Sequence, residues 1–179
     1  MNWIFEVFLF LVIPSCATYF IVRLFFVKKY KFYMFAEVIR LITIAYLNYL
    51  IYIVWLKPAA TMEYLPMNLI PFKTITVYLI QLFNGKLSLS IVISNIIGNI
   101  ILTLPIGVLL PLNFKNITFK KVFLIAFITP LIIESIQLFL HLSKLGTRSI
   151  DIDDVILNFL GTIMGYFIFH YFSIKRLVK

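Results

Sequence analysis

Charged residues are scarce in this chain. Of its 179 residues, 13% are charged, 63% are hydrophobic and 17% are aromatic, and the mean hydropathy is +1.05. A soluble domain of this size carries about 25% charged residues. The polar side chains are too few to cover a water-facing surface, which excludes a soluble enzyme, a disordered tail and a disulfide-built secreted module. The composition predicts an all-α integral membrane protein.

Cysteine is nearly absent, and the strong enzyme signatures are absent. Cys16 is the only cysteine in the sequence, so an intrachain disulfide and a cysteine-based metal cluster are excluded. The sequence has no glycine-rich phosphate loop, no HExxH pair and no GxSxG elbow. We therefore expect no cofactor and no resident metal, and the sequence leaves open whether the protein is an enzyme.

Long apolar runs are abundant. A spanning helix needs about 20 mostly apolar residues. Residues 1–6 lack the basic stretch of a signal peptide, so we expect residues 7–22 to belong to the first span. The piece 74–83 has ten residues, too few to cross a bilayer, and predicts a short interfacial or re-entrant helix. We expect one polytopic membrane domain over residues 1–179, with five spans at 3–27, 35–56, within 87–114, 119–142 and 155–174.

The distribution of Lys and Arg predicts the orientation in the membrane. Cytoplasmic loops are enriched in these residues. The loops on one side of the expected membrane carry nine Lys and Arg residues, and the loops on the other side carry five. The N-terminus is therefore expected outside the cell and the C-terminus in the cytoplasm. We interpret the net charge of +9 as a topology determinant and expect the lipid bilayer, not nucleic acid, as the partner. The cytoplasmic group is Lys28, Lys29, Lys31, Lys115, Lys120, Lys121, Lys175, Arg176 and Lys179, and the outer group is Lys57, Lys73, Lys86, Lys144 and Arg148.

Polar residues in three of the expected spans repeat every three or four positions, which places them on one face of each helix. Polar groups in lipid are costly unless they face a partner or a water-filled cavity. The predicted orientation puts all of them in the outer half of the membrane, so we expect them to converge on one pocket that opens outward. They are Asn95 and Asn99, then Glu134, Gln137 and His141, then Asp154 and Asn158, followed at the same spacing by Gly161 and Gly165.

Glu134 has two interpretations, because a carboxylate inside a span needs a cation or several hydrogen-bond donors unless it is neutral. It is either a proton acceptor or ligand anchor, or a structural hydrogen-bond partner of the asparagines on the neighbouring helices. A different acidic residue, Glu37, lies three positions before Arg40. We expect that pair to neutralise each other near the inner interface.

The connection between the last two spans carries three carboxylates within four residues, Asp151, Asp153 and Asp154, close to Arg148. Such a group can bind a metal, a cationic ligand or Arg148. Alternatively, acidic residues at the start of a helix cap its free backbone N–H groups. We interpret Asp153 as a cap or a solvated residue, and keep Asp151, Asp154 and Arg148 as candidate binding residues.

These polar stretches together resemble the VanZ-like family over about residues 40–172. The resemblance rests on the order and spacing of five pieces: residues 68–72 (NLIPF), 94–99 (SNIIGN), 104–107 (LPIG), 134–137 (ESIQ) and 148–158 (RSIDIDDVILN), with Gly161 and Gly165 beyond them. It implies a small membrane protein of Gram-positive bacteria. The family's namesake confers low-level resistance to the glycopeptide teicoplanin without altering the peptidoglycan precursor terminus. The resemblance implies no reaction mechanism.

Three hypotheses follow. The first is a resistance or envelope protein whose outward pocket binds a lipophilic glycopeptide or a lipid-linked molecule. The second is an intramembrane enzyme that acts on a lipid-linked envelope substrate, with Glu134 as the candidate catalytic residue. The third is a non-catalytic assembly partner whose polar residues only join helices. The expected pocket residues are Asn95, Asn99, Glu134, Gln137, Arg148, Asp151, Asp154 and Asn158.

Overall fold

The structure, a computed structural model, describes residues 3–26, 33–57, 67–145 and 149–177. Five of the helices in these ranges are long and apolar enough to cross a membrane: Trp3–Phe25, Met34–Leu56, Leu89–Asn113, Phe119–Leu142 and Ile152–Ser173. The prediction of an all-α, multi-pass membrane protein with five spans and one shorter helix is confirmed. The chain divides into two units, residues 1–57 and 58–179.

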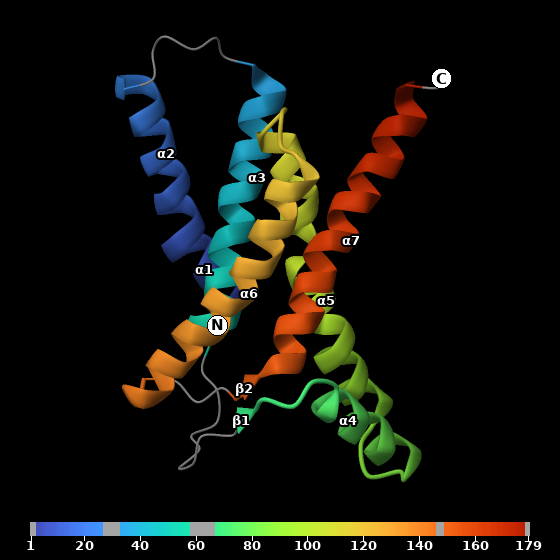
Figure 1. Ribbon diagram of the computed structural model, residues 1–179. Helices are drawn as coiled ribbons and strands as arrows, with labels where there is room; N and C mark the ends of the chain where they lie inside the picture. Colours follow the sequence, from blue (N-terminus) through green and yellow to red (C-terminus); the bar gives the residue numbers. More distant parts are fainter. Residues whose placement is uncertain (1–2, 27–32, 58–66, 146–148, 178–179) are drawn as a thin grey trace. The chain divides into compact units, whose positions relative to one another are not determined.

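The first unit holds the first two spans, and each is a helix with a π-helical turn (Figure 1). Pro14 lies just after the first π-turn. Proline lacks an N–H, and its ring collides with the carbonyl four residues earlier, so it disturbs the regular hydrogen bonding of an α-helix. The wider turn before Pro14 accommodates this mismatch. The elements are α1 (Trp3–Val7), η1 (Phe8–Val12) and α2 (Ile13–Phe26), then α3 (Met34–Ile51) and η2 (Tyr52–Leu56).

Polar and aromatic contacts join the two helical segments of this unit. The Ser15 hydroxyl donates to Asn48 Oδ1 at 3.3 Å, and the Tyr49 hydroxyl donates to the carbonyl of Ile4 at 3.0 Å. The rings of Trp3 and Tyr52 stack with their centroids 5.6 Å apart. Such hydrogen bonds between spanning helices are worth about 1 kcal/mol each.

The second unit consists of one short helix, three spanning helices and a two-residue parallel pairing. The pairing sets Met67 opposite Ile150 and Asn68 opposite Asp151. It ties the segment before α4 to the start of α7, and Figure 1 shows β1, β2 and α4 grouped there. The elements are β1 (Met67–Asn68), α4 (Lys73–Phe83), α5 (Leu89–Asn113), α6 (Phe119–Leu142), β2 (Ile150–Asp151) and α7 (Ile152–Leu177).

Helices α5 and α7 run parallel and approach each other through glycine. A Cβ placed on Gly107 would lie 2.0 Å from the carbonyl oxygen of Thr162, and one on Gly161 would lie 2.2 Å from that of Ile100. These distances are far below van der Waals contact, so only glycine fits. The Thr103 hydroxyl donates to the backbone carbonyl of Asn158 at 2.7 Å across the same contact. Small residues are typical where membrane helices approach this closely.

The orientation predicted from the cations can be measured by cysteine labelling in a Cys16→Ala background. Ser149 precedes β2 and Lys120 lies in the first turn of α6, and both are exposed. We expect Ser149→Cys to react with an impermeant maleimide in intact cells, and Lys120→Cys to react only after permeabilisation. The opposite pattern would contradict the outside location of the N-terminus.

Candidate functional site

Glu134 and Asp151 form the buried base of a carboxylate network. Glu134 is 7% exposed, and its Oε2 accepts the backbone N–H of Asp151 at 3.1 Å. The side chain of Asp151 in turn accepts two bonds at 2.9 Å, one from Asn68 Nδ2 and one from the backbone N–H of Asp153. The parallel pairing of β1 with β2 places Asn68 opposite Asp151, which makes the side-chain bond possible. These donors satisfy carboxylate oxygens that are withdrawn from water.

Asp153 caps helix α4 from outside that helix. It is 1% exposed; its Oδ1 accepts the backbone N–H of Phe72, and its Oδ2 accepts that of Ile75 at 3.1 Å. These are amides at the start of α4 that have no partner within the helix. Phe72 has a left-handed φ of 64°, an uncommon conformation for a residue with a side chain. Asp153 is thus a cap, but of α4, not of its own helix, and the alternative that it is solvated is wrong.

A half-buried edge adjoins this network. Asn99 Nδ2 donates to Asp154 Oδ1, which joins α5 to the first turn of α7. Tyr78 of α4 lies within electrostatic reach: burial raises the pKa of its hydroxyl above the usual value, and the charges of Asp154 and Asp151 raise this pKa further. The Tyr78 hydroxyl is therefore protonated at neutral pH and available as a hydrogen-bond donor.

The other residues predicted to line the pocket do not share one environment. Gln137 and Asn158 are buried in α6 and α7, and among the described residues Asn158 Oδ1 has no hydrogen-bond partner. Asn95 is exposed, and its amide donates to the carbonyl of Ile91 in its own helix at 2.8 Å, so it does not join the network. Arg148 lies outside the described residues.

Sequence reasoning missed two residues at this site, Asn68 and Tyr78. Asn68 belongs to the NLIPF piece of the family resemblance, but the resemblance gives it no role. The spacing of residues along the sequence links neither Asn68 nor Tyr78 to carboxylates some 80 positions later. In the part of the chain that the structure describes, no three His, Cys, Asp or Glu side chains are placed to hold a metal ion.

A cavity of about 460 Å³ lies at the connection between α5 and α6. None of the predicted site residues lines it. Its lining is mainly apolar, with two lysines: Phe114, Lys115, Asn116, Ile117, Lys121 and Ile125.

The fold and the network define a class: a small multi-pass α-helical membrane protein in which a buried carboxylate network joins a short helix to the ends of its spanning helices. The sequence pattern of the VanZ/LLP1 family matches residues 41–174, and the chain belongs to this family. The resemblance inferred from the polar pieces is thereby confirmed. No curated protein and no solved structure gives a match to the chain.

Proposed function

We propose that this protein confers low-level teicoplanin resistance on a Gram-positive bacterium by binding a lipophilic or lipid-linked molecule at the Asn99–Asp154–Tyr78 edge. Membership of the VanZ/LLP1 family supports the class of protein. The observation that carries the choice of site is that this half-buried polar edge adjoins a frame of three buried carboxylates, Glu134, Asp151 and Asp153.

The edge suits a ligand that presents hydrogen-bond donors. Asp154 supplies a carboxylate acceptor, the Asn99 amide donates to it, and the Tyr78 hydroxyl lies within electrostatic reach of it. An ammonium or amide group bound to a carboxylate makes a charge-assisted hydrogen bond, about twice as strong as a neutral one. The supporting frame holds the carboxylate in place before the ligand arrives, which reduces the entropy lost on binding.

Apolar surface beside the edge favours a ligand with a lipid tail. Helix α4 is too short to cross the bilayer, yet Leu79, Ile80 and Phe83 on it are exposed. With the orientation that the cations predict, this helix lies in the outer leaflet. A lipophilic molecule there keeps its tail in the hydrocarbon while its polar part reaches Asp154.

The contact of Glu134 favours a positioning role over that of a general base. Glu134 is 7% exposed, and its carboxylate accepts the backbone N–H of Asp151, so it acts on Asp151 and the connection before α7. A catalytic base would need access to the substrate, an orienting partner and a group that stabilises the developing charge. Turnover of a lipid-linked substrate by the purified protein would support the enzyme hypothesis instead.

Asp154→Asn tests the binding edge. The amide keeps the size of the side chain but loses the charge, so we expect teicoplanin susceptibility to return to that of cells without the protein. Expression and melting temperature in detergent should stay near wild type, because Asp154 is only half-buried. Tyr78→Phe should cause a partial loss.

Two variants serve as controls for that experiment. Asn95→Ala removes an exposed amide outside the network and should keep full resistance. Glu134→Gln keeps an oxygen that can accept the Asp151 N–H and should also keep resistance if Glu134 only positions. Full resistance in Asp154→Asn, or its loss in Asn95→Ala, would contradict the proposed site.

A further inference from the structure

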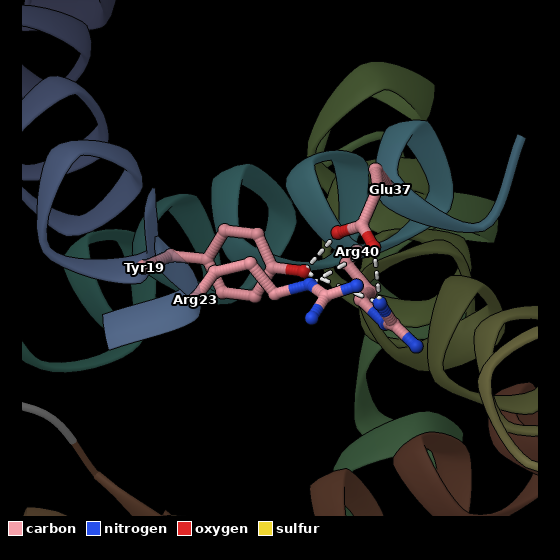
Figure 2. A network of polar contacts seen from close by, with 4 residues as sticks. All are labelled: Tyr19, Arg23, Glu37 and Arg40. Atoms are coloured by element: carbon pink, nitrogen blue, oxygen red, sulfur yellow. Dashed lines mark hydrogen bonds and ion pairs between the residues drawn. The ribbon is translucent and has the colours of Figure 1, made fainter. Parts of the chain in front are cut away.

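A polar cluster of four residues lies in the first unit, at the end of the unit where α2 ends and α3 begins. Arg40 Nη1 contacts Glu37 Oε1 at 2.7 Å, and Arg23 Nε contacts the same oxygen at 3.3 Å. The Tyr19 hydroxyl donates to the other carboxylate oxygen, Oε2. Figure 2 shows the two guanidinium groups and the tyrosine hydroxyl directed at this one carboxylate. The predicted Glu37–Arg40 pair is confirmed, whereas Arg23 and Tyr19 were not predicted.

The cluster carries more positive than negative charge. Arginine stays protonated in proteins, so Arg23 and Arg40 against Glu37 leave one net positive charge. Glu37 is buried and the Arg23 side chain is only 10% exposed, so this charge is partly withdrawn from water. A group of side chains with a net positive charge attracts anions from its surroundings.

Arg40 presents the accessible part of this charge. Its side chain is 45% exposed, and its contacts with Glu37 and Tyr19 both use Nη1. A guanidinium group has five N–H donors in a planar fork whose geometry matches a phosphate group.

We propose that this cluster binds the phosphate of an anionic phospholipid, with Arg40 as the contacting fork and Glu37 and Tyr19 holding that fork in place. A lipid is favoured over a soluble phosphate because apolar side chains flank the cluster on both helices. Leu24 and Phe25 on α2 are 63% and 69% exposed, and Phe35 on α3 is 72% exposed, so acyl chains can cover them. All four cluster residues lie before residue 41, outside the VanZ/LLP1 match.

Native mass spectrometry of the purified full-length protein in neutral detergent tests this site with phosphatidylglycerol, phosphatidylcholine and inorganic phosphate. Near a membrane surface each Lys or Arg contributes about 1 kcal/mol to the attraction of anionic lipid, or roughly fivefold in affinity. We expect Arg40→Gln to bind phosphatidylglycerol about five- to tenfold more weakly, with phosphatidylcholine unchanged. Arg40→Lys keeps the charge without the fork and should fall between.

Lys120→Gln is the matched control, because it removes one exposed cation from the first turn of α6, on the same side of the predicted topology. Its phosphatidylglycerol binding should equal that of wild type. Equal loss in Lys120→Gln and Arg40→Gln, or equal binding of both lipids by wild type, would overturn the proposal. Displacement of phosphatidylglycerol by millimolar inorganic phosphate would overturn the assignment to lipid. If Arg40→Gln fails to fold, indistinguishable lipid binding by Arg40→Lys and wild type would overturn the role of the fork.

Discussion

Gly165→Ala is expected to separate α5 from α7 and to remove most of the folded protein from the membrane. A Cβ at this position would lie 2.0 Å from the carbonyl oxygen of Leu104 and 3.2 Å from Cα of Gly107. Both are backbone atoms, so no side-chain rotation can relieve the clash, and the helices must move apart. That movement would also stretch the Thr103–Asn158 hydrogen bond. We expect a loss of about 3 kcal/mol or more, at the upper end of overpacking effects.

Gly98→Ala is the matched control for that experiment. Gly98 lies in the same helix α5, and a Cβ there would meet nothing within 4 Å. Alanine is the better helix former by about 0.5–1 kcal/mol, so this variant should be as stable as wild type or slightly more stable. Melting temperature and yield in detergent measure both changes. Equal melting temperatures for the two variants would contradict the close approach of α5 and α7.

The spanning helices could be predicted because length and hydropathy are local properties. The start of the last helix was placed at 155, whereas α7 begins at Ile152. Asp153 and Asp154 made these positions resemble a loop, since acidic residues are rarely buried without partners. Their partners are backbone amides at Phe72 and Ile75 and the side chain of Asn99, far away in the sequence. No local pattern reveals such partners.

The asparagines of α5 show how far helical spacing alone can predict which residues join the site. Asn95 and Asn99 share a helix face, and both were expected in the pocket. Asn99 contacts Asp154 and Thr103 contacts Asn158, so partners on the parallel helices differ by 55 positions. The same offset places Asn95 beside residue 150, before α7 begins at Ile152. Asn95 therefore lies beyond the start of the partner helix, and it is exposed. Its spacing could not predict this, because that spacing does not indicate where α7 starts.

Asp153→Ala is expected to release the start of α4 and to destabilise the second unit. The substitution removes two acceptors and leaves the N–H groups of Phe72 and Ile75 without the carboxylate that binds them. A hydrogen bond to a charged group contributes about 1.5–3 kcal/mol, so the loss should be about 3 kcal/mol or more. Phe72 is the more sensitive of the two, because its left-handed φ of 64° persists only while its surroundings hold it.

Hydrogen–deuterium exchange of the peptide covering residues 72–76 measures this release directly. We expect these amides to lose protection in Asp153→Ala, while amides in the middle of α5 keep theirs. Asp153→Asn retains one carbonyl oxygen, so it can cap one of the two N–H groups and should show intermediate protection. Tyr78 belongs to α4, whose start is held by this cap, and lies within electrostatic reach of Asp154. Both variants should therefore also weaken the proposed resistance, in the order of their lost protection. Undiminished protection in Asp153→Ala would mean that the pairing of β1 with β2 alone holds α4 in place.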